Sequence, residues 1–542
     1  MHTNFCECYR SIIAFVILPC IAMQAAVAQK VSYSQNELNP YTQVQTFVVG
    51  RVSSNIVVWK YIPSQETSQI LAYDDNMQFK ARKQANVFAS GDAYQFNLIN
   101  RQNSFDVIAQ VFLKHKYYCQ LASFDEYGNL LRPVVTLLSY KVQKNYEDYC
   151  QFAISDNKKY FLLTSNKLNT GHNEMQSTCY LYYCGDDVNN IAQKTFTMPY
   201  YDGCSLAFSP FNIDNAGSLL CAEYISLPND TVAHVVLYKS LAKSVECTSA
   251  VLDFTNIHLQ NLNIKINNLN QQYIIYGLGC RCEKNAGINL NIEKPQGIFN
   301  WVLNEKLENC NPVTLYKFTT VNTSPGYSNQ SLAAKDVIPL TDNSFTIALT
   351  STAPFQPNVY DDIYDNYVYS NSNVNTQSLF TASNPQAYQP GALAADINAD
   401  APSNYYSTAN YTTKAVKQTR QPVPITDNLF LMRVKNDDKI IWSQAVSSNH
   451  EENAFSYVDK YSLINQGSTL HFICKKILPK NKQSYEEIVV EPWGAVTINP
   501  IMIYNRNYEI FIDEGTQIDS HSMVFPCLYN NNSIAFAKID LE

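Results

Sequence analysis

Along the chain, short apolar stretches alternate with small polar clusters in a pattern that returns many times. The clearest copy is FNLINRQNSFDVIA from Phe96, in which an apolar strand, a turn rich in Asn and Ser, and a second apolar strand follow one another. Apolar runs this short, bounded by turn residues, favour strands over helices. Asn, Asp, Ser and Gly are the residues that tight turns require. The repeated unit is therefore predicted to be a β-hairpin.

Seven further hairpins of this form lie elsewhere in the chain. Strong copies begin at Gln151, Phe211, Asn263, Val337 and Tyr461, and weaker copies begin at Phe47 and Gly515. A third strand, and often a fourth, can be placed after each hairpin. A four-stranded unit that returns at intervals of roughly 50 residues is typical of propeller blades. We therefore predict an all-β fold, a β-propeller of eight blades, with seven blades as the alternative.

The two ends of the repeat predict how the ring closes. The last copy holds only three strands and ends in SIAFAKIDLE, whereas the segment KVSYSQNEL from Lys30 precedes the first copy. We expect this N-terminal segment to supply the missing fourth strand. Runs with an apolar period of 3.6 are few, which disfavours a helical repeat. Strands such as NIVVWKY from Asn55 are apolar on both faces, as expected for a blade packed between two neighbours. Residues 29–542 are thus predicted to form one propeller domain.

One step between hairpins is longer because an insertion of different composition interrupts the sixth blade. Residues 352–424 carry seven of the 22 prolines and eight tyrosines, with many small polar residues and no cysteine. Such a composition cannot build a packed core, so it predicts a flexible extruded loop. The favoured interpretation is a solvated flexible loop. As the alternative, carboxylates could bind calcium there, and aromatic rings could stack on sugars or peptides. The candidate binding residues are Tyr360, Asp361, Asp362, Tyr364, Asp365 and Tyr367.

The N-terminus has the features of a secretory signal peptide, residues 1–28. Arg10 precedes an apolar run, and the small residues Ala26 and Ala28 fit the cleavage pocket of signal peptidase, so cleavage after Ala28 is predicted. Pro19 interrupts the apolar run, which disfavours a permanent membrane anchor. A lipoprotein anchored through Cys20 is a weaker alternative, because the bulky Pro19 stands where a small residue is expected. The mature chain is predicted to be exported and to lack a transmembrane segment.

Composition and charge narrow the functional classes. Hydrophobic residues make up 46% of the chain and charged residues 16%, which is typical of a globular protein. The abundance of Tyr (38) and Phe (26) favours strands. The net charge of -8 comes with no basic tract, which argues against a nucleic-acid partner.

The cysteines leave three interpretations open. Twelve of the 15 remain after removal of the signal peptide, which carries Cys6, Cys8 and Cys20. They can be buried thiols in apolar strands, disulfides of an exported chain, or metal ligands. Two close pairs, Cys179 with Cys184 and Cys280 with Cys282, lack the two-residue spacing of zinc sites. No metal and no other cofactor is predicted.

Searches for catalytic motifs are mostly negative. The chain has no phosphate-binding glycine loop, no HExxH, no GxSxG and no EF-hand loop. His172 and Glu174 show the H-x-E spacing of deaminases, but the PCxxC partner is missing. Carboxylates at hairpin turns could converge on a channel, as in propeller glycosidases, but the favoured interpretation is that they stabilise their own turns. Four aspartates recur in this way: Asp156, Asp214, Asp342 and Asp519. No catalytic residue is assigned.

Several strand sequences carry a resemblance to a known group. NIVVWKY followed by ILAYDDNMQF, the strand STLHFIC, and the closing segment VFPCLYNNNSIAFAKID together resemble a group of exported proteins from Bacteroidota with no assigned activity. The likeness spans nearly the whole mature chain and includes a Tyr/Ser-rich insertion late in the chain. It implies export in a Gram-negative cell, to the periplasm, the cell surface or the medium. No cofactor, substrate or site residue follows from it.

Two functional hypotheses remain. The first is a non-enzymatic scaffold that binds an envelope protein or a glycan through its loops, with the 352–424 insertion as the expected contact. The second is a carbohydrate-active or other hydrolytic enzyme that uses carboxylates in the channel, since a propeller fold by itself is compatible with both. The oligomeric state is left open by the sequence.

Overall fold

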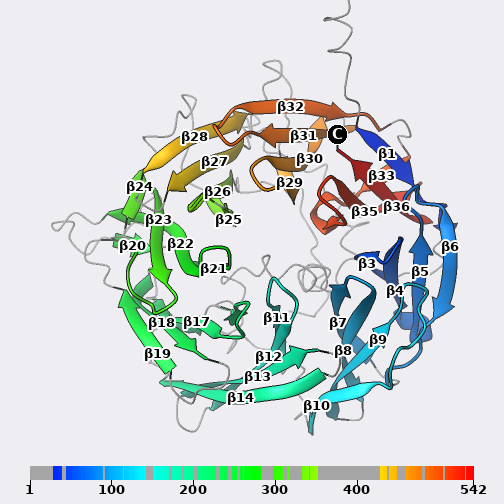
Figure 1. Cartoon of the computed structure of the whole chain (residues 1–542), viewed down its shortest axis with the longest axis horizontal. Helices are drawn as coiled ribbons and strands as arrows, with labels where there is room; N and C mark the ends of the chain where they lie inside the picture. The colour runs from blue at the N-terminus through cyan, green and yellow to red at the C-terminus, as the bar shows by residue number, and fades with distance from the viewer. Residues whose placement is uncertain are drawn as a thin grey trace, which may run out of the picture.

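Eight blades are arranged in a ring, which makes the protein an eight-bladed β-propeller (Figure 1). The described strands of these blades form seven sheets, because two blades share one sheet. The computed structural model describes residues 29–38, 44–89, 92–113, 115–141, 150–169, 174–185, 188–199, 205–208, 210–226, 232–241, 247–252, 257–259, 262–281, 297–310, 314–317, 332–340, 342–351, 428–435, 439–447, 458–478, 482–503, 507–530 and 533–541.

The first three blades are four-stranded antiparallel sheets in which the strands follow chain order from the axis outward. Blade one contains β3 (Gln45–Val52), β4 (Asn55–Ile62), β5 (Thr67–Tyr73) and β6 (Phe79–Gln84). Blade two contains β7 (Asp92–Arg101), β8 (Ser104–Leu113), β9 (Lys116–Phe124) and β10 (Val135–Lys141). Blade three contains β11 (Gln151–Ile154), β12 (Tyr160–Asn169), β13 (Glu174–Cys184) and β14 (Val188–Pro199).

Blades four and five form one ten-stranded sheet, because β18 and β20 pair between Val232 and Leu259. Blade four contains β15 (Ser205–Phe208), β16 (Asn212–Ile213), β17 (Leu219–Ser226), β18 (Val232–Ser240) and β19 (Cys247–Leu252). Blade five contains β20 (Ile257–Leu259), β21 (Asn263–Asn267), β22 (Gln272–Arg281), β23 (Gly297–Asn304) and β24 (Thr314–Lys317).

Blades six and seven are again four-stranded. The second and third strands of blade six are paired neighbours, so the chain between them, which includes the predicted insertion, leaves and re-enters the same sheet. Blade six contains β25 (Leu332–Pro339), β26 (Ser344–Ser351), β27 (Asn428–Lys435) and β28 (Ile440–Ser447). Blade seven contains β29 (Val458–Asn465), β30 (Leu470–Leu478), β31 (Lys482–Val490) and β32 (Val496–Ile501).

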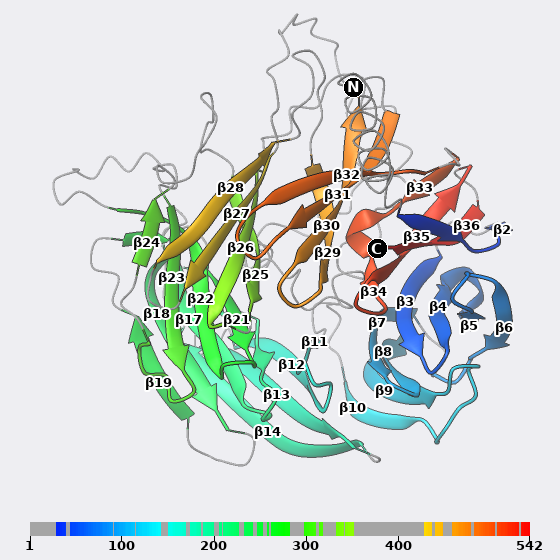
Figure 2. The same ribbon diagram turned by 45° about the horizontal axis from the view of Figure 1, so that its top comes forward.

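Blade eight joins the two ends of the chain. Its inner strand is split into β33 (Tyr508–Ile510) and β34 (Thr516–Gln517), followed by β35 (Ser522–Tyr529) and β36 (Ser533–Asp540). The N-terminal strands β1 (Lys30–Tyr33) and β2 (Glu37–Leu38) pair antiparallel with β36 and form its outer edge (Figure 2). Apart from strands, the described residues contain two 3-10 turns, η1 (Pro63–Gln65) and η5 (Ile512–Glu514).

The predicted architecture is confirmed. All eight predicted hairpins are present, and the eighth blade takes its fourth strand from the N-terminal segment. Tyr33 stacks on Tyr508 of blade eight with ring centroids 4.1 Å apart, and Glu37 forms ion pairs with Lys60 and Arg82 of blade one. The closing segment therefore belongs to blade eight by backbone hydrogen bonds and is tied to blade one by the side chain of Glu37.

The interface between blades one and two shows how most blades pack. The ring of Trp59 on β4 is fully buried and lies 5.6 Å from the ring of Phe96 and 5.8 Å from that of Phe124. Phe105 and Val107 of blade two are buried in the same cluster. Because both faces of the second strand of a blade are covered by neighbouring blades, its side chains are apolar at successive positions. Large aromatic side chains thus fill the wedge between blades.

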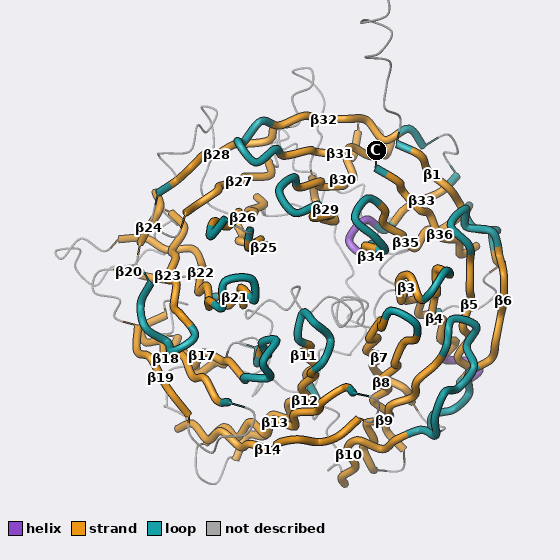
Figure 3. The backbone as a smooth tube through the Cα atoms, viewed as in Figure 1, coloured by secondary structure: helices purple, strands orange, loops and turns teal. Residues whose placement is uncertain are grey.

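Hairpin turns near the axis are linked from blade to blade (Figure 3). In blade three, the backbone N–H of Asn157 donates to Asn215 Oδ1 at 2.8 Å, and Asn157 Nδ2 donates to the Asn215 carbonyl. Asn215 of blade four in turn donates its N–H to Asn268 Oδ1 of blade five at 2.9 Å. Asn268 Nδ2 reaches back to Asp156 at 2.6 Å. These three turns form one hydrogen-bonded unit, here called the turn ladder.

Among the residues that the structure describes, no helix is long and apolar enough to cross a membrane.

Candidate functional site: a polar pocket between blades seven and eight

The face of blade seven that meets blade eight is apolar at one end and polar at the other. Side chains alternate between the faces of a strand, so Ile473 and His471 of β30 share this face. Ile473 packs into the apolar cluster with Tyr485 and with Phe525 of blade eight. Two residues before Ile473 on the same face, the apolar side chains give way to His471. Glu487 of the neighbouring strand β31 and other polar side chains lie next to it. A pocket lies at this polar end.

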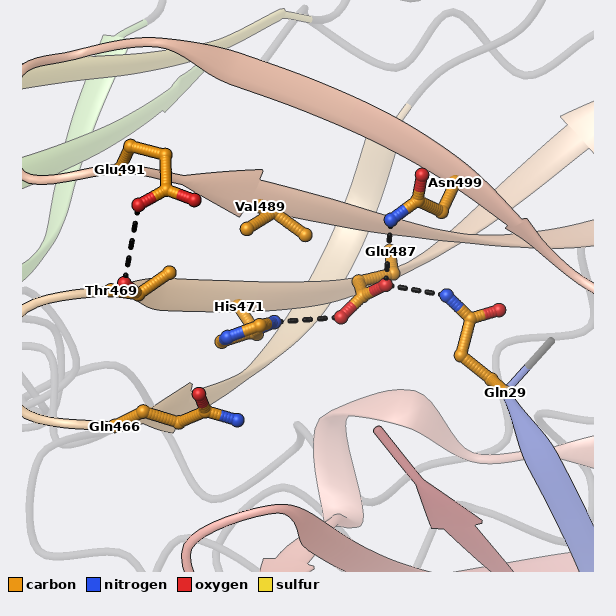
Figure 4. Close-up of a pocket in the computed structure, with 8 residues that line it drawn as sticks. All are labelled: Gln29, Gln466, Thr469, His471, Glu487, Val489, Glu491 and Asn499. Atoms are coloured by element: carbon orange, nitrogen blue, oxygen red, sulfur yellow. Dashed lines mark hydrogen bonds and ion pairs between the residues drawn. The ribbon is translucent and has the colours of Figure 1, made fainter. Parts of the chain in front are cut away.

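The pocket encloses about 270 Å³. It is lined mainly by side chains from blade seven. Among the described residues, the contribution from outside that blade is Gln29, which precedes β1 of blade eight (Figure 4). Strand register places the polar groups together, because Glu487 pairs with Ile473 on one side and with Asn499 on the other. The lining residues are Gln29, Gln466, Thr469, His471, Glu487, Val489, Glu491 and Asn499.

Glu487 is the central group of the pocket and is only 4% exposed. Its carboxylate accepts three hydrogen bonds: from His471 Nδ1 at 2.7 Å, from Asn499 Nδ2 at 3.0 Å, and from Gln29 Nε2. Burial alone would raise the pKa of Glu487, but these donors outweigh the burial and hold the pKa below its ordinary value. The carboxylate is therefore charged and fully occupied by the protein's own donors.

His471 is oriented by that carboxylate. A deprotonated carboxylate can only accept, so Nδ1 must carry the proton of the shared hydrogen bond. In the neutral imidazole the other nitrogen, Nε2, is then an acceptor. Nε2 is buried and has no hydrogen-bond partner, although His471 as a whole is only 5% exposed. A buried polar atom without a partner costs roughly 1–3 kcal/mol, so this nitrogen is poised to accept a hydrogen bond from something that enters the pocket.

Gln466 supplies a second buried polar atom without a hydrogen-bond partner. It lies in the turn between β29 and β30, and its Nε2 is also buried without a hydrogen-bond partner. On the rim, Thr469 Oγ1 donates to Glu491 Oε2 over a long 3.4 Å, which leaves the Glu491 carboxylate with further capacity to accept. The pocket thus presents an unused acceptor on His471, an unused donor on Gln466, and a weakly occupied carboxylate on Glu491.

An exposed aromatic side chain lies on the turn that carries Glu491. Trp493 is 70% exposed, the highest value among the large hydrophobic side chains of the described residues that remain open to solvent. The turn itself is held firmly, because the backbone N–H of Gly494 donates to the Glu491 carbonyl and the Trp442 indole donates to the Pro492 carbonyl at 3.0 Å. Trp493 is therefore a large apolar surface on a fixed turn, two residues after Glu491 in the chain.

The four turn aspartates from the sequence analysis are engaged by the protein itself. Asp214 accepts the N–H groups of Ala216 and Ser218 of its own turn, Asp342 accepts that of Ser344, and Asp519 accepts that of His521. For these three the turn-stabilising interpretation is confirmed. Asp156 differs, because it accepts from Asn268 within the turn ladder.

Two of these aspartates also have basic partners. Arg433 approaches Asp342 at 2.8 Å, and Arg51 approaches Asp519 at 3.1 Å. Burial raises their pKa values, but hydrogen bonds and the arginine charges outweigh it and hold both below the ordinary value. They are ionised acceptors in fixed contacts, and each serves the turn from which it projects.

Other candidates from the sequence are placed as follows. The residues of the insertion, Tyr360 to Tyr367, and His172 lie outside the described residues. Glu174 is the first residue of β13 and pairs with Pro199. No group of three or more potential metal ligands occurs among the residues that the structure describes.

None of the cysteines whose side chains the structure describes forms a disulfide. Burial raises the pKa of Cys179 and Cys184 to about 12, as expected for inert core thiols. Cys247 and Cys310 are exposed. Seven are buried: Cys119, Cys150, Cys179, Cys184, Cys221, Cys474 and Cys527.

Sequence reasoning did not identify the pocket. His471 looked like one of several scattered histidines, and Glu487 is one of two adjacent glutamates. The one available signal was alternation: in both β30 and β31, a polar residue takes a position on the face where Ile473 and Tyr485 are buried. Alternation alone does not locate the pocket. The strand register is also needed, because it brings together residues from separate strands and Gln29 from the other end of the chain.

Comparisons with known proteins add little beyond the fold. No family profile and no curated protein matches the chain. Among solved structures, it is similar to the Nup133 β-propeller domain of Vanderwaltozyma polyspora, with 8% identity, 95% of this chain and 99% of that chain covered, and a TM-score of 0.38. It is also similar to the polysaccharide lyase Uly1, with 10% identity, 94% and 100% covered, and a TM-score of 0.40. The β-propeller domain of the Trilobed protease from Pyrococcus furiosus gives 9% identity, 83% and 95% covered, and a TM-score of 0.35. Likeness at this level carries no argument about activity.

Proposed function

We propose that this protein is an exported, non-enzymatic propeller scaffold that binds a protein or glycan partner of the cell envelope. The observation that supports binding is the pocket between blades seven and eight, where His471 Nε2 and Gln466 Nε2 are buried without partners. Groups in this state gain hydrogen bonds when a ligand arrives. Such a pocket suits recognition of a polar group.

The carboxylates give less support to a hydrolytic enzyme. A hydrolase of the glycosidase type needs one carboxyl group that donates a proton and a second that acts as base or nucleophile. Asp214, Asp342 and Asp519 are hydrogen-bonded in their own turns, and Glu487 is saturated by three donors. These groups hold the structure in place.

The test combines binding and turnover on the same sample. The mature chain is immobilised and presented with purified envelope polysaccharides and solubilised envelope proteins, while release of reducing ends and of peptides is followed in solution. We expect saturable retention of a defined partner without release of product. Product release that disappears in Asp214→Asn or Asp342→Asn would overturn the scaffold proposal in favour of an enzyme.

Export is tested separately. The protein purified from its native host should begin at Gln29, as read by N-terminal sequencing. Retention of residues 1–28, or a lipid on Cys20, would contradict cleavage after Ala28.

A further inference from the structure

We propose that the pocket between blades seven and eight is a saccharide subsite, which holds one neutral sugar unit through its hydroxyl groups. This inference rests on the proposed binding function and names the class of ligand. It is carried by the unpartnered groups of the pocket, its size and its charge, and the exposed indole of Trp493 lies on the turn that carries the rim residue Glu491.

The unpartnered groups specify a hydroxyl. When the His471 imidazole is neutral, its Nε2 needs a donor, because Nδ1 carries the proton of the hydrogen bond to Glu487. Gln466 Nε2 needs an acceptor. A hydroxyl group both donates and accepts, so one hydroxyl, or two on adjacent carbons, satisfies both atoms. A carboxylate or phosphate ligand would leave the histidine nitrogen unsatisfied, and an ammonium ligand would leave the glutamine amide unsatisfied.

The charge of the pocket points to a neutral ligand. Glu487 is ionised, but its oxygens are occupied by His471, Asn499 and Gln29. Among the residues that the structure describes, no Lys or Arg lines the pocket to neutralise an anion. Glu491 on the rim accepts only one long hydrogen bond, from Thr469, and can accept from a further hydroxyl. Carboxylates, amides and a histidine around a small space are the groups that bind a polyhydroxylated molecule.

The volume of the pocket favours a sugar over a single water molecule as its ligand. A buried water needs only about 10–15 Å³ of accessible space, whereas this pocket encloses about 270 Å³. Pockets for drug-sized ligands start near 300 Å³, so the available room suits one ring rather than an extended chain. A sugar ring also has apolar C–H faces, and Trp493 on the adjacent turn offers an aromatic surface for such a face.

The experiment uses three probes, D-glucose, D-galactose and N-acetyl-D-glucosamine, with cyclohexanol as a ring of similar size that has a single hydroxyl. Ligand protons are observed by saturation transfer, and the His471 ring is observed by its 15N resonances. We expect at least one sugar to receive saturation and to shift the His471 Nε2 resonance, because that nitrogen gains a hydrogen bond, while cyclohexanol binds at least tenfold more weakly.

Variants identify the site. His471→Gln and Gln466→Ala should each weaken sugar binding about tenfold, the factor that corresponds to one lost hydrogen bond of about 1.4 kcal/mol. Gln466 lies in a turn and is half-buried, so its replacement tests the proposal even where a change at His471 impairs folding. Trp493→Ala should weaken binding as well. His521→Gln, a matched change in an exposed turn of blade eight, should leave binding unaltered.

Each other outcome overturns the subsite. If no sugar shifts the His471 resonance, ordered water alone fills the pocket. If sugar binding persists in both His471→Gln and Gln466→Ala, the sugar binds elsewhere. In either case, retention of an envelope partner by the unchanged protein would leave the proposed scaffold function standing, whereas loss of both would remove it.

Discussion

The interface between blades one and two and the interface between blades seven and eight solve the same packing problem with different chemistry. At the first, Trp59 sits among Phe96, Phe105 and Phe124, and the wedge is filled by rings. At the second, apolar side chains such as Ile473 and Phe525 fill one end of the interface, and the other end is a pocket around Glu487. The fully packed interface stabilises the ring. The interface between blades seven and eight has less apolar packing, but it contains a polar pocket that can hold a ligand. Five predictions test this contrast, from the largest expected effect to the smallest.

Removal of Lys30–Tyr41 should have the largest effect. This segment provides β1 and β2, which cover the edge of β36, and Glu37, which forms ion pairs with Lys60 and Arg82. Its loss exposes an unpaired strand edge and removes the Glu37 ion pairs between blade eight and blade one. We expect a fall in melting temperature, measured by differential scanning calorimetry, that exceeds that of any point substitution below. An unchanged melting temperature would contradict closure by the N-terminal strand.

Trp59→Ala should be the most damaging single substitution of the set. The side chain is fully buried, and its removal leaves a cavity among rings that cannot collapse into it. Replacement of a large core aromatic residue by Ala lowers the free energy of unfolding by about 3–5 kcal/mol. Chemical denaturation should show this loss without a change in sugar binding, because Trp59 belongs to an interface at blade one, away from the pocket.

Glu487→Ala should lower the free energy of unfolding by less than Trp59→Ala does, but it should weaken sugar binding more. It leaves the donors of His471, Asn499 and Gln29 without their acceptor, and a buried donor without a partner costs roughly 1–3 kcal/mol. The imidazole also loses the contact that orients it, so sugar binding should fall together with stability. Glu487→Gln, which keeps an acceptor oxygen, should recover part of both.

The pH dependence of stability should further distinguish the interface of blades seven and eight, which contains Glu487, from that of blades one and two, which contains Trp59. The pKa of Glu487 is lowered in the folded state, so its contribution to stability is present above the ordinary Glu value and is lost as the pH falls through the lowered folded value. The stability difference between the unchanged protein and Glu487→Gln should therefore shrink as the pH falls below about 4.5. The loss caused by Trp59→Ala should stay constant over the same range, since no ionisable group takes part. Equal pH dependence in both variants would contradict this assignment.

Replacement of residues 352–424 by a short Gly-Ser linker should have the smallest effect on stability. Closure entropy changes by only about 0.6 kcal/mol for each doubling of loop length, and the flanking strands β26 and β27 pair directly. Limited proteolysis of the unchanged protein is expected to cut first between Pro354 and Pro424. Weaker partner capture by the shortened protein would assign the contact to the insertion, while equal capture would direct attention to the pocket.

The sequence predicted the ring but not the pocket, for a physical reason. Hairpins are local, and the turn chemistry around Asp214 or Asn268 can be recognised from neighbours in the chain. The closing strand was also predictable, because a three-stranded last copy requires a partner. The pocket is non-local: Gln29 and Glu487 are 458 positions apart, and their contact depends on a strand register that no local pattern specifies. The candidate residues in the insertion were chosen by composition, and their role remains a prediction.

The turn ladder has a consequence for how such a protein can diverge. Each of its turns donates to or accepts from the turn of the next blade through backbone groups as well as side chains, so a residue inserted in one turn would misalign the next. Descendants of this chain should therefore keep the lengths of the turns at Asn157, Asn215 and Asn268 constant. Length variation should accumulate at connections such as that between β26 and β27, whose flanking strands stay paired whatever lies between them. Selection for new partners would then act on one set of loops while the other set keeps the ring in register.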